Sequence, residues 1–293
     1  MFETALEIAG AFTFPYVGLR RKHDGAVFST VGAFIVVNSQ GWAITAAHLM
    51  AEIVQAKQSA RAAADLDARI AELKRKNGKR SNKERHELEQ LETRKRGFLS
   101  HSAEIWALPG FSETHPHIAE HHIAANADVA AFRLTPFDAT VIAHYPDFRE
   151  GQASVKPGTA VCRVGFPWHH VETTFDDASG FVVGTGFPVP TFAIDGMVSR
   201  FNAQQFPDGS ECTYIETSAP GLRGQSGGPL LDAEGRVCGL QSGTAHYDLG
   251  FDASYVRNGK KVVERQFLNV GRALHVDDIK RFLDSLEIAY SIG

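Results

Sequence analysis

The sequence predicts an all-β fold, a sandwich or a barrel, that one helical insertion interrupts. Outside residues 52–98 the chain consists of short runs rich in Val, Ile, Phe and Thr, which Gly, Pro, Asp and Asn residues separate. Short runs at regular spacing are typical of antiparallel sandwiches and barrels. The clearest strand-like runs are Phe34–Val37, Val161–Val164, Phe181–Val183, Tyr214–Thr217 and Val237–Gln241. The 293 residues are enough for two packed cores, since a typical domain has about 100–150 residues.

The helical insertion is predicted as an antiparallel hairpin. Residues 52–76 contain no Gly or Pro, and their apolar side chains recur at steps of three and four, as on a helix face. Asn77–Asn82 has the composition of a turn, and Lys83–Arg96 predicts a second helix. A further helix is expected at Val276–Leu286, where apolar residues again fall on one face.

The segment Gly224–Pro229 has the composition of a loop that presents a nucleophile. Glycines surround Ser226 where a backbone must turn tightly, expose a hydroxyl and aim N–H groups at a substrate carbonyl. Taken alone, a serine between glycines is a turn residue, and its hydroxyl is a poor nucleophile without a base. The catalytic interpretation therefore depends on a base and an orienting acid elsewhere in the chain.

His48 and Asp128 are the candidates for that base and that acid. His48 ends the apolar run Trp42–Ala47, and Asp128 precedes the apolar run Val129–Phe132. Each alone is typical of a structural role, as a satisfied histidine after a strand or as a cap at the start of one. With Ser226 they occur in the order His, Asp, Ser, which is that of chymotrypsin-like enzymes. The three residues together predict a Ser–His–Asp catalytic triad.

The chain resembles the trypsin-like serine peptidases, and within them the HtrA-like bacterial branch, along nearly its whole length. The segments that carry this resemblance are Gly32–Val37, Gly41, Thr45–His48, Lys156–Gly158, Val164–Pro167, Gly196–Ser199, Ile215–Ala219 and Gly271–Leu274. The resemblance implies two antiparallel six-stranded β-barrels with the triad in the cleft between them. We expect the first barrel in residues 1–150, with the hairpin inserted at about 52–98, and the second barrel with its closing helix in residues 151–293.

The resemblance also implies a role for each site residue. His48 would take the proton from Ser226 and pass it to the leaving amine, while Asp128 orients His48. The backbone N–H groups of Gly224 and Ser226 would hold the oxyanion. Gln225 stands before the nucleophile, where zymogen-activated relatives have Asp, so activation by a newly cut N-terminus is not expected.

Two segments beside the nucleophile are expected to select the substrate. Pro220 stands six residues before Ser226, where trypsins carry Asp. Without a carboxylate there, a Lys or Arg side chain before the cleaved bond would lose its solvation uncompensated, so a non-basic residue is expected. Arg223 is either a solvated surface side chain or a rim residue that favours acidic groups. The expected substrate-binding residues are Pro220, Gly221, Arg223, Gln241, Ser242, Gly243 and Thr244.

The composition leads us to expect a cytoplasmic protein, unlike the mostly exported HtrA relatives. The first residues contain no basic run, and no apolar stretch approaches the roughly 18–20 residues that a membrane span needs. The cysteines Cys162, Cys212 and Cys238 are few and widely spaced, which indicates buried thiols rather than a disulfide framework. Glu287–Gly293, which follows the closing helix, is too short for the PDZ domain that HtrA relatives carry.

The helical insertion is the segment expected to bind a partner. It carries 13 basic and 8 acidic side chains, a net of +5, in a chain of net charge −4. It is either a solvated hairpin or an arm that docks a regulatory protein or a second protomer. Nucleic acid is disfavoured because the charges are mixed in sign. No cofactor is expected, and no metal, because the histidine-rich segment 101–122 lacks helical HExxH spacing and cysteine ligands.

Two functions of different classes remain open from the sequence. The first is an endopeptidase that cleaves a cytoplasmic protein through an acyl-enzyme. The second is a catalytically silent module that binds an extended peptide or acts as a scaffold. The complete Ser, His and Asp set favours the endopeptidase, and an esterase-like hydrolase on the same site is a weaker third interpretation.

Overall fold

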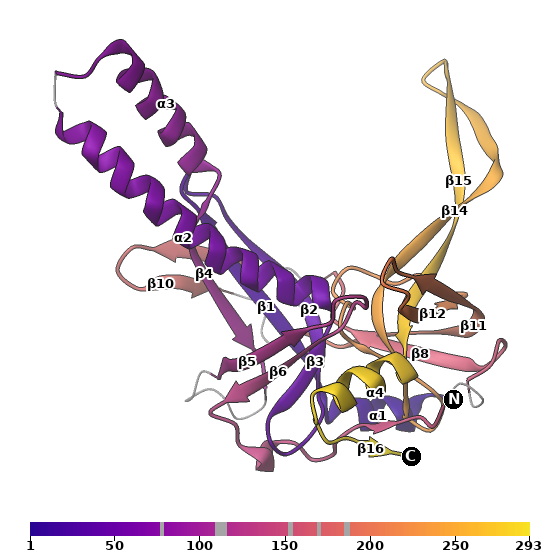
Figure 1. The fold of residues 1–293 in the computed structure, drawn as a ribbon. Helices are drawn as coiled ribbons and strands as arrows, with labels where there is room; N and C mark the ends of the chain where they lie inside the picture. The colour runs from indigo at the N-terminus through magenta and orange to yellow at the C-terminus, as the bar shows by residue number, and fades with distance from the viewer. Residues whose placement is uncertain (77–78, 109–115, 152–154, 169–170, 185–187) are drawn as a thin grey trace.

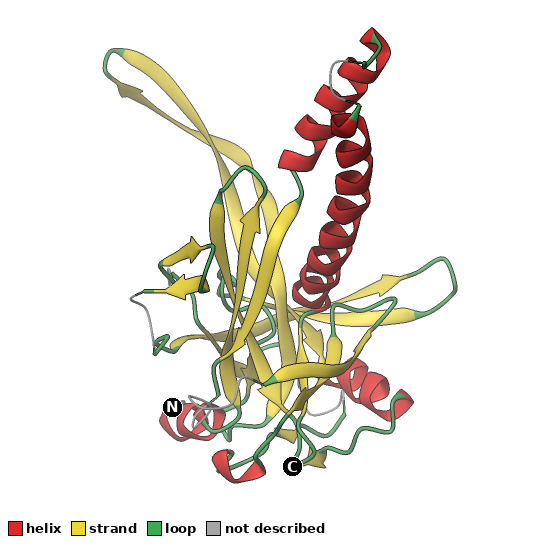
Figure 2. Ribbon diagram, turned by 90° about the vertical axis from the view of Figure 1, so that its left-hand side faces the viewer, coloured by secondary structure: helices red, strands yellow, loops and turns green. Residues whose placement is uncertain are grey.

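A computed structural model describes residues 1–76, 79–108, 116–151, 155–168, 171–184 and 188–293 (Figure 1). Two β units lie side by side, and two long projections leave them on the same side of the molecule (Figures 1 and 2). The expectation of an all-β protein with a helical hairpin and a C-terminal helix is confirmed.

The first β unit is a six-stranded antiparallel sheet in the order β4-β1-β2-β3-β6-β5. Its strands are β1 (Thr13–Lys22), β2 (Val27–Val36), β3 (Trp42–Thr45), β4 (Leu99–Trp106), β5 (His117–Ile123) and β6 (Ala130–Thr135). Phe34, Trp106 and Phe132 pack their rings together inside its curve. The two edge strands are not paired with each other within the described residues, so the sheet is a curled half-barrel.

The second β unit closes into a ring. Its six strands are β8 (Ala160–Gly165), β11 (Phe192–Gln205), β12 (Glu211–Thr217), β13 (Pro229–Leu231), β14 (Val237–Arg257) and β15 (Lys260–His275). β13 pairs with both β8 and β14, which joins the two ends of the sheet. Two short parallel strands, β7 (Asp147–Phe148) and β16 (Ser291–Ile292), extend it beyond β14. β9 (Thr173–Asp176) and β10 (Gly180–Val183) form a separate ribbon.

The described residues form four α-helices. They are α1 (Glu3–Gly10), α2 (Ala47–Arg75), α3 (Asn82–Arg96) and α4 (Val276–Ser285), with the short 3-10 helix η1 at Ala139–Val141. Helix α4 buries Ile279 and Leu283, as expected, whereas α1 was not expected from the sequence. Helix α2 begins earlier than expected because Leu49, Met50 and Ile53 pack into the core of the first unit.

A shared core fixes the orientation of the two β units. Ile35 and Val129 from the first unit meet Leu240 and Leu274 from the second in one buried cluster. The cluster also takes in α1 and α4, whose apolar faces close its outer side. The strand ends that carry the candidate residues are therefore held at a fixed separation.

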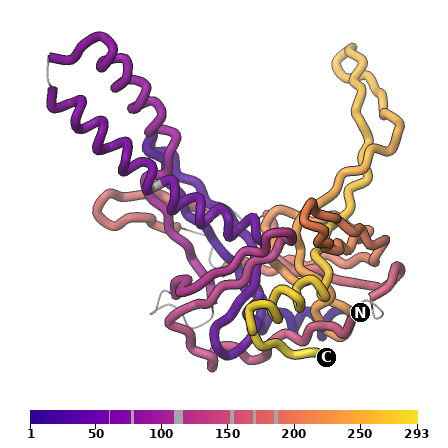
Figure 3. The backbone as a smooth tube through the Cα atoms, viewed as in Figure 1, coloured from indigo at the N-terminus to yellow at the C-terminus, as the bar shows by residue number. Residues whose placement is uncertain are grey.

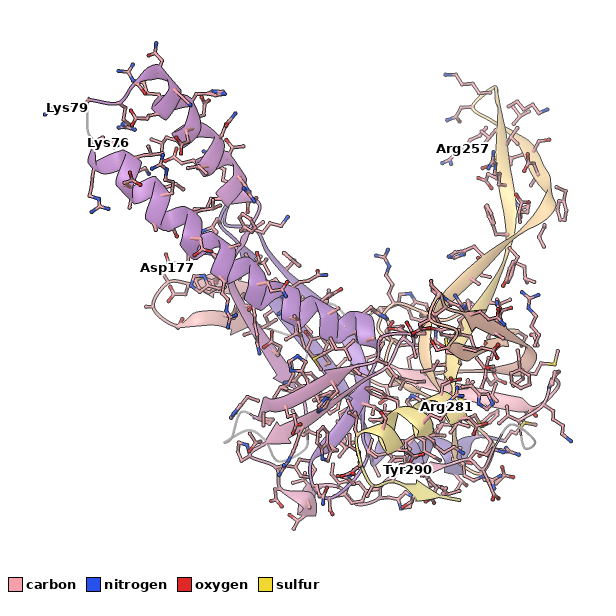
Figure 4. The ribbon with its side chains drawn as sticks, viewed as in Figure 1. Lys76, Lys79, Asp177, Arg257, Arg281 and Tyr290 are labelled. Atoms are coloured by element: carbon pink, nitrogen blue, oxygen red, sulfur yellow. The ribbon has the colours of Figure 1, made fainter. Side chains whose placement is uncertain are left out.

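The helical arm, residues 60–98, is the first projection. Its two helices pack Ile70, Leu73 and Leu88 into a small core of their own, with Leu66 and Leu91 at its edge. Ion pairs link the helices across this core, at Arg69–Glu87, Lys74–Glu92, Lys76–Glu84 and Lys95–Asp67. Lys76 and Lys79 stand at its tip (Figure 4).

The strand arm, residues 246–269, is the second projection, and it was not expected from the sequence. There β14 and β15 leave the ring as a two-stranded ribbon (Figure 3), with Arg257 near the tip in Figure 4. Asn258 and Gly259 turn the chain with φ values of 52° and 73°. An Asn-Gly pair is the strongest short-range sign of such a hairpin, so the sequence did contain the necessary signal.

Two further observations concern the chain as a whole. Cys162, Cys212 and Cys238 are buried and unpaired, as expected. None of the helices in the described part of the chain combines the length and apolar character needed to cross a bilayer.

Candidate active site

His48 and Asp128 form a hydrogen-bonded pair at one edge of the first β unit. The end of β3 pairs with the start of β6, Thr45 opposite Ala130, so the residues beyond these strand ends lie together. Nδ1 of His48 lies 2.9 Å and 3.1 Å from the two carboxylate oxygens of Asp128. The backbone N–H of His48, in the first turn of α2, also donates to Asp128 Oδ1 at 3.0 Å. These contacts leave Nε2 of His48 as the nitrogen that is available to a reacting group.

The pair shifts the titration of both of its members. The hydrogen bond to Asp128 raises the pKa of His48, against the opposing effect of burial. Burial alone would raise the pKa of Asp128, but its hydrogen bonds with His48 and Ser242 outweigh burial and lower the pKa. Asp128 is therefore held as a carboxylate beside a base that accepts a proton more readily than an isolated imidazole.

Ser226 lies on a loop that is tied to both β units. Its backbone oxygen accepts a hydrogen bond from Ala33 N of β2 at 2.8 Å, and Gly227 N donates to Gln241 O at 2.8 Å. Gly227 has a φ of 81°, and a Cβ there would lie 2.2 Å from Ala33 O. Only glycine fits this close approach, and so the predicted glycine-rich loop has a specific steric cause.

The same loop carries two unused backbone donors. Within the described residues, the N–H groups of Gly224 and Ser226 donate no hydrogen bond, although their carbonyls accept from Phe166 and Ala33. The loop conformation is fixed around them, because Gln225 N donates to Leu222 O and the Gln225 side chain accepts from Leu222 N. Two free N–H groups on a fixed loop beside a serine are the kind of donors that an oxyanion hole uses.

Two members of the predicted triad, His48 and Ser226, line one cavity of about 860 Å³ between the β units. His48 and Glu52 on α2 line its first wall, and Ser226 and Gly224 its second, with Arg223 and Trp168 among the other lining residues. No hydrogen bond joins Ser226 to His48 in the described part of the chain; the Ser226 hydroxyl donates to Ser242 O at 3.4 Å instead.

A second cavity of about 550 Å³ adjoins the nucleophile and contains most of the expected substrate-binding residues. Its lining includes Pro220, Gly221, Leu222, Arg223, Ser226, Gly243, Thr244, His246 and Asn269. His246 and Asn269 were not expected, because they belong to the root of the strand arm. Gln241, by contrast, is buried behind the wall, where its Nε2 donates to Gly243 O at 2.7 Å.

Ser242 has a side-chain contact that the sequence did not predict. It was expected as a substrate-binding residue, but its hydroxyl also donates to Asp128 Oδ2. Asp128 thus receives hydrogen bonds from both β units, which couples the orientation of the acid to the second unit. No local pattern in the sequence marks this long-range contact.

The histidine-rich segment does not gather a metal site among the described residues. His122 on β5 lies 2.9 Å from Glu120, and this is a pair rather than a cluster. His115 lies outside the described residues.

Comparison with known proteins gives a consistent result. The family model described as trypsin-like peptidase domain matches residues 32–240. Among solved structures, a variant of the HtrA-type protease AlgW with decapeptide is similar at 12% identity and a TM-score of 0.52, covering 98% of this chain and 66% of that chain. AlgW itself with decapeptide gives 13% identity and a TM-score of 0.50, covering 97% and 67%.

A variant of AlgW with tripeptide gives 13% identity and a TM-score of 0.50, and this chain spans only 63% of its length. At such identities the structural likeness shows the fold alone. No curated protein sequence matches this chain.

Proposed function

Because this chain belongs to the trypsin-like peptidase family, we propose that it is a serine endopeptidase whose catalytic triad is Ser226, His48 and Asp128. One observation carries the proposal. A hydrogen-bonded His48–Asp128 pair shares a cavity with a serine whose loop leaves two N–H groups free. Nucleophile, base, orienting acid and oxyanion donors are the complete set that acyl transfer requires.

The mechanism follows from the positions of these groups. Nε2 of His48 takes the proton from Ser226 Oγ as this oxygen attacks the peptide carbonyl, and the free N–H groups of Gly224 and Ser226 bind the oxyanion. His48 then gives the proton to the leaving amine as the C–N bond breaks, which leaves an acyl-enzyme. Water attacks the acyl group by the same route and restores Ser226. Asp128, held by Ser242, keeps His48 in the required tautomer.

We expect the cleaved bond to follow a non-basic residue. The second cavity has no Asp or Glu among its described lining residues, and Pro220 supplies no charge. A Lys or Arg side chain would therefore enter without a counter-charge. We also propose a cytoplasmic protein substrate, which three unpaired buried thiols support; fractionation of cells that express the tagged chain tests this compartment.

Labelling with a fluorophosphonate probe tests the proposed chemistry. The wild-type protein should bind the probe covalently and cleave an unbiased peptide library. Ser226→Ala should lose both properties while its melting temperature is kept. The matched control is Ser285→Ala, which removes an exposed serine at the end of α4 and should label like the wild type. Probe labelling or peptide cleavage by Ser226→Ala would exclude this serine as the nucleophile.

A silent peptide-binding module is the second candidate, because the Ser226 hydroxyl donates to Ser242 O rather than to His48. Catalytic hydrogen bonds are often long or misaligned before substrate binds, so this geometry does not itself exclude turnover. Saturable binding of a library peptide without labelling or cleavage would select the silent module.

We further propose that the helical arm docks a regulatory protein or a second protomer. Its own core stabilises it apart from the β units, and its root, α2, carries His48 and Glu52 into the cavity. A partner that binds the arm therefore contacts the same helix, α2, that positions His48.

A shortened arm tests this proposal. The ion pair between Asp67 and Lys95 holds the two helices side by side, so a short Gly/Ser turn in place of residues 68–94 leaves α2 intact near His48. The shortened enzyme should cleave a small generic substrate at the wild-type rate but lose selective cleavage of its physiological target. Equal cleavage of that target would contradict the proposed role.

A further inference from the structure

A buried arginine without a carboxylate partner lies behind the substrate pocket. Arg163, on β8, is only 1% exposed. Its Nη1 donates to Ala219 O at 2.9 Å, its Nη2 to the Thr217 hydroxyl, and its Nε has no partner. No carboxylate oxygen lies within ion-pair distance of it in the described part of the chain. Buried charges are otherwise paired, so this guanidinium has an unmet need for an anion.

The backbone geometry places this charge beside Thr244, which lines the pocket. Thr244 and Gly271 are opposite each other in the β14–β15 ladder, and such partners project their side chains to the same face. A Cβ on Gly271 would lie 2.0 Å from Arg163 Nη1, so the guanidinium fills the side-chain space of that glycine. Thr244 and the Arg163 guanidinium are therefore neighbours on one face.

Both groups reach across to the opposite wall of the pocket. Thr244 Oγ1 donates to Gly221 O at 2.6 Å, and Arg163 donates to Ala219 O two residues earlier. Thr244 and the guanidinium thus bind the same segment, residues 219–221, two residues apart.

Several side chains of this cavity can donate a hydrogen bond to a carboxylate. Arg223 and Asn269 line the cavity, and Thr244 contributes a hydroxyl. None of the described lining residues is acidic. A carboxylate in the pocket would accept from Thr244 in exchange for Gly221 O, and it would lie near Arg163, which has no counter-ion among the described residues.

We propose that Arg163 is a specificity determinant that selects substrates with Asp or Glu immediately before the cleaved bond; this inference rests on the proposed peptidase function. The charge is present under physiological conditions. Burial lowers the pKa of Arg163 to about 10, which still leaves the guanidinium protonated at neutral pH. The proposal narrows the expectation of a non-basic residue to an acidic one and assigns Arg223 as an accessory cation at the rim.

Isosteric peptide pairs test this charge selection. Fluorogenic peptides with amidated C-termini, identical except for Glu or Gln, and Asp or Asn, before the cleaved bond, present the same shape with and without the carboxylate. The amide end ensures that the only carboxylate offered is the side chain. Wild-type kcat/KM should be at least about tenfold higher for the acidic member of at least one pair. Equal or better cleavage of Gln and Asn peptides would overturn the proposal.

Two substitutions assign the preference to the buried guanidinium. Arg163→Met removes the charge at similar volume and should abolish the acidic preference, whereas Arg163→Lys keeps a charge and should retain part of it. The matched control is Arg20→Met. Arg20 is equally buried, but it lies in the first β unit, 3.3 Å from Glu104, and its loss should leave the preference unchanged. An acidic preference that survives in folded Arg163→Met would exclude this residue as its source.

The fluorophosphonate probe separates failure of this inference from failure of the proposed function. The probe carries no carboxylate, so it reports the triad alone. If the probe labels the wild type but the acidic peptides are cleaved no faster than the uncharged ones, the inference is wrong and the proposed peptidase function stands. Absence of labelling and of cleavage overturns both. If Arg163→Met is too unstable to label, the wild-type peptide pairs still decide the question.

Discussion

The two β units contribute opposite halves of the proposed chemistry, and they carry arms of opposite construction. The first unit supplies His48 and Asp128 and bears the helical arm, whose helices share a buried core. The second unit supplies Ser226 and the pocket and bears the strand arm, which leaves Phe251 and Val256 exposed. An isolated two-stranded hairpin is marginally stable in water, whereas paired helices with a core are more self-sufficient.

This contrast shows where the two halves depend on each other. The roots of both arms line the substrate cavities, through Glu52 on α2 and through His246 and Asn269 on the strand arm. Ser242 and Ala33 each send a hydrogen bond across the boundary between the units. Changes at these hydrogen bonds between the units should therefore affect catalysis strongly, and changes at the far ends of the arms should affect it weakly.

Asp128→Asn should have the largest effect, because it disables the half of the site that belongs to the first unit. An amide would hold His48 in the wrong tautomer, and kcat should fall by about 10⁴-fold while the fold is kept. Steady-state kinetics on a generic peptide, together with a melting curve, measure both quantities. A loss of less than tenfold would show that Asp128 does not orient the base.

Gly227→Ala should rank second, because it forces apart the contact between the Ser226 loop and β2. The new Cβ meets Ala33 O at 2.2 Å, and φ is 81°. We expect a loss of about 2–5 kcal/mol in unfolding free energy from strain and overpacking, with a large loss of activity. Gly209→Ala is the matched control, since φ is 82° there with nothing within 4 Å. It should cost only about 1–2 kcal/mol in chemical denaturation and keep full activity.

Leu73→Ala should affect one arm and leave the site unchanged. Leu73 is fully buried between α2 and α3, and its truncation should cost about 2 kcal/mol of local stability, the low end for a Leu-to-Ala change. Hydrogen exchange of the α3 amides should accelerate at least about tenfold while kcat stays constant. Val256→Ser in the strand arm, at a site 72% exposed, should change the unfolding free energy by less than about 0.5 kcal/mol. A reduced kcat in Leu73→Ala would instead show that the arm core supports the site.

Glu52→Gln should have the smallest effect, on the pH profile. The hydrogen bond to Asp128 is the main cause that raises the pKa of His48 above its usual 6.5, and the charge of Glu52 adds to it. Since the base must be neutral, kcat/KM should fall on the acid side with a midpoint above pH 6.5. Glu52→Gln should move that midpoint downward, by less than Asp128→Asn does. An unchanged midpoint would show that the charge of Glu52 does not affect the pKa of His48.

Local patterns were sufficient for the helical arm and for the individual candidate residues. The spacing of apolar residues and the capping box between Ser81 and Glu84 are properties of neighbouring residues, so the helices could be predicted. The strand arm was not predicted, although Asn258 and Gly259 mark its turn.

By itself, the sequence determined the β-rich class, the helical insertion and the closing helix, and it predicted Ser226, His48 and Asp128 as the catalytic residues. These depend on periodicity, glycine placement and short motifs, which act over a few residues. Only the tertiary structure decided that Ser242 holds Asp128, that Gln241 lies behind the pocket wall, and that the buried Arg163 donates to Ala219 O. Those contacts join residues up to 114 positions apart. Which partners meet across such distances is set by strand register and close packing of the whole fold, and no local signal encodes it.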